Sequence, residues 1–360
     1  MMAAELYATR PQRVEGSIAP EPTAPERIGQ YELVFKLASG GMATVYLART
    51  HAASSFNRVV ALKRIHRDLI GEPGYRVMFL DEARIAFQIM HPNVCTIFDF
   101  GEADGEYYLA MEYLIGEPLS RLMNRVAKVP KRQRSPDQAF KMSRIIADAC
   151  AGLHAAHELK NAHGRLLEVV HRDVTPRNLF VTYDGTVQVV DFGIASAGLR
   201  LRSTPTEQLR GNVAYMAPEQ FAGSPSDRRV DTWALGVTLW EMLAMRRLFK
   251  RDTPMSTILS VIYDEIRPPS EYWPHIPKEL DEIVLKALQR DPEKRWQTAG
   301  EMGLALRQFL DVQQEVIGPA DLSEWMASLF PQGEARKQQL VEVARSGRTG
   351  AVSRRSERTR

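Results

Sequence analysis

The sequence predicts an α+β protein in which a strand-rich N-terminal part precedes a larger, mainly helical part. Between residues 31 and 37 every second side chain is apolar or aromatic, and residues 59–62 form an apolar run rich in valine. Such alternation and short β-branched runs are typical of strands. Residues 138–157 instead carry apolar side chains at the spacing of one helix face. The length of 360 residues predicts about two structural units.

The composition is that of a globular protein with a large core. Hydrophobic residues make up 44% and charged residues 25%, and 47 basic against 44 acidic residues leave a net charge of +3. This balance predicts neither a nucleic acid nor a membrane as partner. The two cysteines, Cys95 and Cys150, favour a reducing compartment, and the apolar surroundings of Cys150 favour packing over a redox role. Because no apolar run reaches 18 residues and no signal peptide is recognisable, we expect a cytoplasmic protein.

The two ends of the chain differ from its centre. Residues 1–30 are rich in proline without any period, which predicts a disordered leader. Residues 311–344 predict a helical extension that begins with a capping box at Asp321–Glu324. Its apolar side chains share one helix face: Leu322, Trp325, Met326, Leu329 and Phe330. We expect this apolar face to pack on the large, mainly helical part of the chain. Binding of the face to a separate partner or to a membrane is the alternative. Residues 345–360, with six arginines and one glutamate, predict a disordered basic tail.

A polar segment, His171–Asn178, lies between the apolar runs 169–170 and 179–181. An acid at Asp173 and a carboxamide at Asn178 suit a short catalytic loop between two buried anchors. The segment resembles the catalytic loop of protein kinases. This resemblance implies that Asp173 accepts the proton of a substrate hydroxyl and that Asn178 binds a magnesium ion.

Further kinase motifs occur before and after this loop in the family's order. The run Val59–Lys63 resembles the V-A-I-K strand, which implies that Lys63 binds ATP phosphates and pairs with a glutamate of the next helix. That glutamate is Glu82, in a helix expected over residues 76–90. The inner face of this helix is expected to carry Val77, Leu80, Ala83, Arg84 and Phe87. Residues 191–193 resemble the D-F-G motif, which makes Asp191 a second magnesium ligand.

Three distal residues are implied to be structural. Residues 217–219 resemble the A-P-E motif, and residues 231–236 the D-x-W-x-x-G segment that begins with Asp231. In the family the A-P-E glutamate pairs with a late arginine, and the corresponding residues are Glu219 and Arg295. Burial of both charges would make the loss of either one cost about 3–5 kcal/mol.

The segment 37–45 resembles the glycine-rich loop of kinases, with only the middle glycine retained as Gly40. For this segment alone, an ordinary hairpin turn at Gly40 and Gly41 is the alternative. Ala38 and Ala43 occupy the other two glycine positions. An alanine forced into a glycine conformation costs about 1–2 kcal/mol, which would weaken nucleotide binding about ten- to thirtyfold.

The resemblance also implies which residues contact ATP. Residues 111–114 match the hinge, where the Glu112 carbonyl and the Leu114 backbone would bind adenine. The implied ATP-binding residues are Leu37, Ala38, Ser39, Gly40, Gly41, Met42, Ala43, Thr44, Val45, Ala61, Lys63, Glu82, Glu112, Leu114 and Phe180.

One departure concerns the chemistry directly, because Thr175 stands where serine/threonine kinases usually place a lysine that contacts the γ-phosphate. Asn212 replaces the threonine that meets that lysine, so we expect a neutral hydrogen-bonded pair of Thr175 and Asn212. The lost charge-assisted bond is worth about 1.5–3 kcal/mol, or roughly ten- to 150-fold in rate. Pro176 and Tyr215 favour serine and threonine over tyrosine as acceptors.

The segment between Asp191 and Glu219 resembles an activation loop. Its hydroxyls Ser203, Thr204 and Thr206 lie among arginines, and Arg172 matches the arginine that receives a loop phosphate in the family. Autophosphorylation is therefore an expected switch, and an exposed loop without regulation is the alternative.

The resemblance covers about residues 31–310. It implies a two-lobed protein-kinase-like fold, with a small β-rich lobe at 31–113 and a larger, mainly helical lobe at 114–310. The motifs most resemble the eukaryote-like serine/threonine kinases of bacteria, which transfer the γ-phosphate of ATP, with Mg²⁺, to protein hydroxyls. The altered glycine loop and Thr175 leave a pseudokinase, a nucleotide-binding scaffold, as the alternative.

Overall fold

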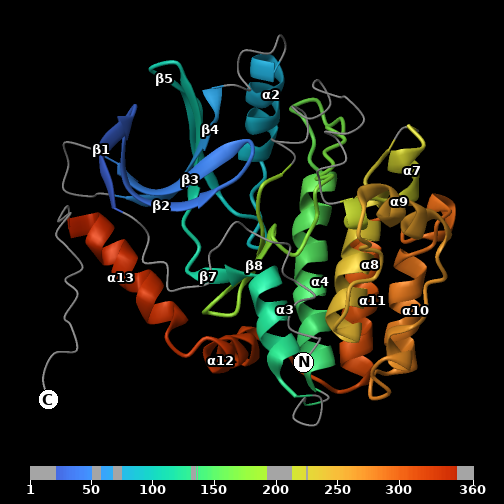
Figure 1. Cartoon of the computed structure of the whole chain (residues 1–360). Helices are drawn as coiled ribbons and strands as arrows, with labels where there is room; N and C mark the ends of the chain where they lie inside the picture. The colour runs from blue at the N-terminus through green and yellow to red at the C-terminus, as the bar shows by residue number, and fades with distance from the viewer. Residues whose placement is uncertain are drawn as a thin grey trace, which may run out of the picture.

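The computed structural model describes residues 22–50, 58–67, 75–130, 135, 137–192, 213–223 and 226–346. The predictions made for Ser203, Thr204, Thr206 and Asn212 lie outside these residues, as does the basic tail beyond residue 346. In the described part, a sheet with the helix α2 forms a small lobe, and most of the other helices form a larger lobe (Figure 1). This arrangement agrees with the predicted α+β fold.

A six-stranded antiparallel sheet builds the small lobe, in the order β1-β2-β3-β4-β6-β5. The elements are β1 (Pro22–Ile28), β2 (Tyr31–Ser39), β3 (Ala43–Thr50), β4 (Val59–Ile65), α2 (Tyr75–Phe87), β5 (Ile97–Ala103) and β6 (Glu106–Glu112). The predicted alternation holds only in part, because Leu33–Phe35 of β2 and Tyr46–Ala48 of β3 are buried without a break. Both faces of these strands are covered, one by the cluster of Ile28 and Tyr108 and the other by the cluster of Ala344.

The larger lobe combines a short three-stranded sheet with helices. Its elements, with the C-terminal extension, are β7 (Gly116–Pro118), α3 (Leu119–Lys128), α4 (Asp137–His157), β8 (Leu179–Thr182), β9 (Val187–Val189), α7 (Pro218–Phe221), α8 (Arg229–Ala244), α9 (Pro254–Tyr263), α10 (Lys278–Ala287), α11 (Ala299–Val312), α12 (Pro319–Leu329) and α13 (Gly333–Ser346). The strands pair antiparallel in the order β7-β8-β9, and the segment His171–Asn178 leads directly into the middle strand, β8.

Residues 22–28 form β1, so the prediction of a leader over residues 1–30 was wrong for them. β1 pairs antiparallel with β2, with Ile28 opposite Tyr31, and Ile28 is 1% exposed. Its register shifts between Pro22 and Glu26. Because β1 is an edge strand, prolines that lack an N–H are tolerated there, although they read as breakers in the sequence.

The helix α2 forms near its predicted place but buries a different face. Phe79 and Ala86 are buried, whereas Val77 is 63% and Phe87 46% exposed. The predicted inner face was therefore right for Ala83, which is fully buried, and wrong for Val77, Arg84 and Phe87, which are exposed. The ring of Phe79 packs edge-on against Tyr107 of β6, 5.9 Å between centroids, which fixes the rotation of the helix.

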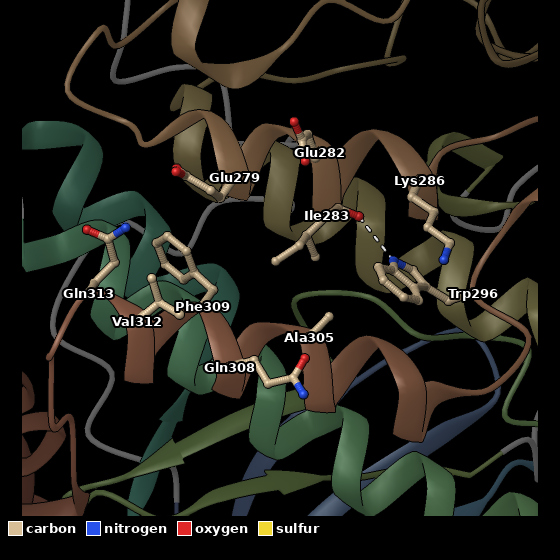
Figure 2. Close-up of a pocket in the computed structure, with 10 residues that line it drawn as sticks. All are labelled: Glu279, Glu282, Ile283, Lys286, Trp296, Ala305, Gln308, Phe309, Val312 and Gln313. Carbon is tan, nitrogen blue, oxygen red and sulfur yellow. Dashed lines mark hydrogen bonds between the residues drawn. The ribbon is translucent and has the colours of Figure 1, made fainter.

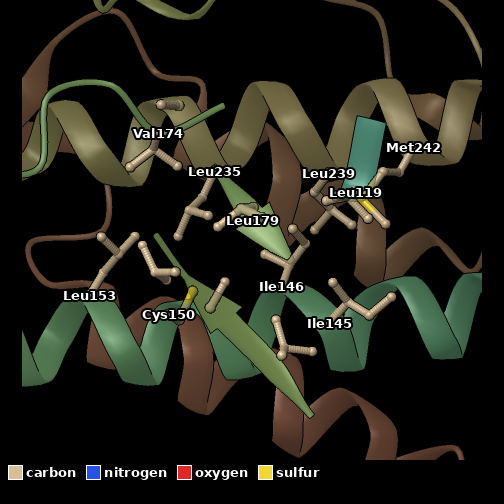
Figure 3. Close-up of a cluster of buried hydrophobic side chains, with 14 of the residues drawn as sticks. Leu119, Ile145, Ile146, Cys150, Leu153, Val174, Leu179, Leu235, Leu239 and Met242 are labelled. Carbon is tan, nitrogen blue, oxygen red and sulfur yellow. The ribbon is translucent and has the colours of Figure 1, made fainter. Parts of the chain in front are cut away.

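The core of the large lobe lies directly under the catalytic segment (Figure 3). Val174 within that segment and Leu179 directly after it pack with Ile146 and Leu153 of α4 and Leu235 of α8. All five side chains are at most 1% exposed. Burial of each contributes about 1.5–3 kcal/mol, so the loop between them rests on a rigid base.

The predicted extension packs on the large lobe. Leu322 and Met326 of α12 are fully buried, and α12 contacts α3 and β8. The helix begins at Pro319, two residues before the predicted capping box, because the Asp321 carboxylate accepts a hydrogen bond from the Gly318 N–H at 2.8 Å. Among the described residues no helix combines the length and the apolar character needed to cross a membrane.

Candidate active site

The segment His171–Asn178 forms a loop in which the two chemistry-bearing side chains touch. The Asn178 amide Nδ2 donates to Asp173 Oδ2 at 3.0 Å and to the Asp173 carbonyl at 2.9 Å. The Asn178 N–H donates to the Thr175 carbonyl at 2.9 Å, which closes a tight turn between them. The Asp173 carboxylate is therefore held in place by a neutral donor, the Asn178 amide.

Asp231, at the start of α8, holds the beginning of this loop. Its fully buried carboxylate accepts hydrogen bonds from the N–H groups of His171 and Arg172 and from His157 Nε2, each at 2.8 Å. Burial alone would raise the pKa of Asp231, but the hydrogen bonds from His157 and from the His171 N–H contribute to holding it below its ordinary value. Arg172 has a left-handed backbone with φ 65°, and its N–H is one of the three donors. The carboxylate thus stabilises a backbone conformation that an arginine rarely adopts.

His171 connects the catalytic loop to the segment of Asp191. Its Nε2 is 3.0 Å from the Val190 carbonyl, and its Nδ1 accepts from the Asp173 N–H at 3.3 Å. This pattern assigns the proton to Nε2. The buried ring also contacts Phe192, with 4.7 Å between ring centroids. One side chain therefore sets the spacing between the segments of Asp173 and Asp191.

Lys63 reaches this group from the small lobe. It lies in β4, is 7% exposed, and its Nζ donates to Asp191 Oδ1 at 2.7 Å. The Val190 N–H donates to the Asn178 carbonyl at 2.9 Å, which brings Asp191 beside Asn178. Because the Asn178 nitrogen bonds Asp173, its amide oxygen remains to bind a metal ion. A carboxylate and an amide oxygen are ligands that a hard divalent cation prefers.

Glu82 stands elsewhere than the resemblance implied. With Arg172 and Phe192 it lines a pocket of about 130 Å³ between α2 and the segment before the catalytic loop. The ion pair of Lys63 in this structure goes to Asp191, where we expected Glu82. The rotation of α2 explains the difference, because it turns Glu82 toward the pocket that holds Phe192.

Residues 31–303 match the model of the family described as protein kinase domain. This chain belongs to the protein kinase family. It is 42% identical over 308 residues to the tyrosine-protein kinase MasK of Myxococcus xanthus, covering 86% of this chain and 47% of MasK. It is 36% identical over 285 residues to the serine/threonine-protein kinase PknB of Mycobacterium leprae, covering 78% and 43%.

Structural comparison gives the same family. The kinase domain of PknI from Mycobacterium tuberculosis aligns with 80% of this chain and 98% of its own length, at 25% identity and a TM-score of 0.59. The chain spans less than half the length of the curated relatives MasK and PknB. The likeness therefore concerns the kinase domain.

The glycine loop of this kinase domain is the turn between β2 and β3, as predicted. The Gly40 N–H donates to the Ala43 carbonyl at 2.9 Å, and β2 and β3 pair up to Ser39 and Thr44. Ala38 and Ala43 lie in the strands, and neither has a positive φ. The expected penalty for alanine was therefore wrong for this structure, because neither position needs a glycine conformation.

The remaining implied ATP-binding residues come from β2, β3, β4, β8 and the segment after β6. Ala61 of β4 pairs with Met111 of β6, which places both beside the hinge. The Glu112 N–H donates to the Thr96 carbonyl at 2.9 Å, and Leu114 is 8% exposed. Phe180 lies in β8, on the large-lobe side. The other implied residues, Leu37, Ser39, Gly41, Met42, Thr44 and Val45, belong to β2, β3 and their turn.

The distal pair of Glu219 and Arg295 forms as the resemblance implied. The two side chains make a bidentate ion pair, with Nη1–Oε1 at 2.6 Å and Nη2–Oε2 at 2.7 Å. The Arg295 guanidinium also donates to the Gln289 carbonyl at 2.5 Å and stacks over Trp233 at 5.0 Å. This pair fixes the A-P-E segment on the large lobe.

Thr175 is part of the loop core. It is 2% exposed, and its buried Oγ1 makes no hydrogen bond within the described part of the chain. Asn212, its predicted partner, lies outside that part. Because the hydroxyl is buried, it does not replace the lysine's charge at the surface of the loop.

Three residues of the site were missed by the sequence analysis. His157 and His171 hold the catalytic segment, and buried Glu241 accepts hydrogen bonds from Tyr215 Oη at 2.9 Å and Arg247 Nη1 at 2.9 Å. Burial raises the pKa of Glu241. The spacing of His171 two residues before Asp173 was the available signal for one of them. No local pattern marks Glu241, which anchors the segment that carries Tyr215.

A larger pocket lies away from this site, between α10 and α11 (Figure 2). It holds about 340 Å³, and Ile283, Trp296 and Phe309 form its apolar walls. Glu279 and Glu282 stand on its rim. None of the predicted site residues lines it.

Proposed function

We propose that this domain transfers the γ-phosphate of ATP to hydroxyl groups of proteins. The observation that carries the proposal is the convergence of Lys63, Asp173, Asn178 and Asp191 from both lobes. Asp173 is held where it can accept a hydroxyl proton, and Lys63 offers a positive charge to the phosphates. The pseudokinase alternative finds no support in this group, because each of the four side chains is present and in place.

The cation would be Mg²⁺, bound by Asp191 and the Asn178 amide oxygen. When bound, it neutralises the charge that develops on the transferred phosphoryl group. These two residues supply only oxygen ligands, which suits Mg²⁺ better than softer metals. The Val190–Asn178 backbone bond keeps the two ligand-bearing segments together.

Serine and threonine are the proposed acceptors. PknB is named a serine/threonine kinase, as is PrkC of Bacillus subtilis, which is 32% identical over 286 residues. MasK, at 42% identity, is named a tyrosine kinase, so tyrosine is the second candidate. Our preference rests on Pro176 and Tyr215, which stand in the catalytic loop and in the segment before A-P-E. Phosphorylation of its own activation segment, with Arg172 as phosphate receiver, is the proposed switch.

The test is transfer of labelled phosphate from ATP to casein and myelin basic protein, followed by phosphoamino-acid analysis. Lys63→Met should lower the rate by about 10²–10³-fold, since it removes one charge-stabilising group. Lys278→Met, which changes an exposed lysine at the start of α10, should leave the rate unchanged. EDTA should abolish transfer, and added Mg²⁺ should restore it.

The phosphoamino-acid analysis tests the acceptor residue, and the transfer assay tests the kinase activity itself. Phosphoserine or phosphothreonine would confirm the proposed acceptor residues. Phosphotyrosine alone would overturn the choice of serine and threonine but would leave the proposed kinase activity standing. Absence of transfer by the unaltered protein, with ATP binding shown separately, would replace the enzyme by a nucleotide-binding scaffold.

A further inference from the structure

The extension after the kinase core is attached to both lobes (Figure 1). α12 contacts α3 and β8 of the large lobe, and α13 contacts β3 and β4 of the small lobe and β7 beside the hinge. The chain between residues 319 and 346 therefore passes from one lobe to the other on the side of the hinge. The family match ends at residue 303, before this segment.

The attachment to the large lobe is apolar with one specific polar bond. Leu322 and Met326 are fully buried, and Ser323 Oγ donates to the Tyr183 carbonyl at 2.7 Å. The Phe330 ring stands edge-on to the Tyr183 ring, with 6.5 Å between centroids. This end of the extension is therefore a fixed part of the large lobe.

The attachment to the small lobe is centred on one alanine. Ala344 of α13 is fully buried and clusters with Val34, Phe35 and Leu47 of β2 and β3. Arg49 Nη1 donates to the Ala344 carbonyl at 3.2 Å. β2 and β3 carry the glycine loop at their other end, so α13 holds the strands that cover the nucleotide site.

The middle of α13 is bound to the hinge region. Lys337 Nζ donates to the Gly116 carbonyl and lies 3.9 Å from Glu117 Oε2. Gly116 follows the implied adenine-binding Leu114 by two residues. Burial lowers the pKa of Lys337 despite the nearby carboxylate of Glu117. A partly buried lysine that bonds the Gly116 carbonyl restricts the backbone about which the lobes would rotate.

We propose that α12 and α13 form an interlobe strap, in which Lys337 and Ala344 position the small lobe for nucleotide binding. The inference rests on the proposed function, because ATP must contact Lys63 of one lobe and Asp191 of the other. Two lobes joined by a hinge alone sample open arrangements in which these contacts cannot form together. A segment bound to both lobes raises the population of the binding-competent arrangement.

The size of the effect follows from that population. If detachment of α13 lowers the competent fraction to about one tenth, the apparent dissociation constant for the nucleotide rises about tenfold. The chemical groups between the lobes remain the same. The strap variants should therefore weaken nucleotide binding and raise the KM for ATP more than they lower kcat at saturating ATP.

The first test measures binding of adenylyl imidodiphosphate with Mg²⁺ by calorimetry. Ala344→Glu should raise the dissociation constant about tenfold, because it places a charge in the small-lobe cluster. Ala335→Glu is the matched control, since Ala335 is exposed on the same helix. Lys337→Met should also weaken binding, and Lys337→Arg should retain it because it keeps a donor for the Gly116 carbonyl. Equal dissociation constants for all four variants and the unaltered protein would overturn the proposal.

The second test measures the lobe arrangement without nucleotide. Spin labels at Lys36→Cys on β2 and Leu304→Cys on α11 lie on exposed positions of the two lobes, and the native cysteines are buried. Electron–electron distances should be narrowly distributed in the parent protein and in Ala335→Glu, and broadened in Ala344→Glu and Lys337→Met. Unbroadened distances in both strap variants would overturn the strap, whether or not the protein transfers phosphate. A protein that shows the broadening but transfers no phosphate would instead contradict the proposed function.

Discussion

Replacement of Asp231 by asparagine is the most informative single change in the catalytic segment. The carboxylate accepts three hydrogen bonds at 2.8 Å, two from backbone N–H groups and one from His157 Nε2. An asparagine of the same size keeps one acceptor oxygen and turns an NH₂ group toward at least one of these donors. Each charge-assisted hydrogen bond contributes about 1.5–3 kcal/mol. Removing one partner of a buried charged interaction, which leaves the other partner buried and unpaired, costs about 3–5 kcal/mol. We expect Asp231→Asn to lower the free energy of unfolding by about 3–5 kcal/mol.

The same change should lower the rate of phosphotransfer. The left-handed backbone of Arg172 is held by Asp231, and such strain amounts to about 1–3 kcal/mol. Once released, the loop that carries Asp173 relaxes, and kcat should fall about five- to 160-fold for that amount of free energy. The KM for ATP should change less, because Lys63 and the hinge are untouched.

Urea denaturation followed by circular dichroism measures the stability, and initial rates measure kcat. Asp227→Asn is the control, because Asp227 has the same chemistry four residues earlier but a side chain that is 57% exposed, and it should cost less than about 1 kcal/mol. The pKa of Asp231 is lowered in the folded protein, so its contribution is fully present above the unfolded pKa of about 3.9 and is lost as the pH falls below it. The difference in the free energy of unfolding between Asp231→Asn and the unaltered protein should thus be constant from pH 6 to 8. Equal stability of the two variants would refute the role assigned to Asp231.

The remaining predictions concern other parts of the domain. Arg295→Met leaves the Glu219 carboxylate half-buried without its cation and should cost about 3–5 kcal/mol in urea denaturation, whereas a cost below 1 kcal/mol would contradict the buried pair. Gly116→Ala should lower Tm by several degrees, since a β-carbon there meets the Val181 carbonyl; Gly41→Ala, with open space around it, should leave Tm unchanged. Thr175→Val removes a buried hydroxyl that makes no hydrogen bond in the described structure. The free energy of unfolding of this variant should therefore stay within about 1 kcal/mol of that of the unaltered protein. A large loss of stability in Thr175→Val would show that the hydroxyl has a partner in the activation segment.

The catalytic group was predictable from the sequence because its chemistry and order are local. An aspartate, an asparagine five residues later and a second aspartate each stand between apolar anchors, and the order of the motifs carries the resemblance. The turn between β5 and β6 was also encoded. Asp104 and Gly105, between β5 and β6, both have positive φ, as a two-residue turn requires.

Other features depend on contacts between segments far apart in the chain. The sequence of α2 contains two apolar stripes, and packing of Phe79 on Tyr107 decides between them. The role of α13 rests on a small alanine and one lysine, Lys337, neither of which stands out in a charged helix. Likewise, the kinase motifs offer two carboxylates that could pair with Lys63, those of Glu82 and Asp191. Only the three-dimensional structure shows that Lys63 bonds Asp191.

We propose that Asp173, which is held by Asn178, performs phosphotransfer together with Lys63 and Asp191. The most direct test is intact-mass and peptide mass spectrometry of the purified protein after incubation with Mg-ATP, beside Asp173→Asn. We predict added phosphate on serine or threonine of the unaltered protein, and none on Asp173→Asn. Equal phosphate on both proteins, or none on the unaltered protein and on a generic protein substrate, would contradict the account.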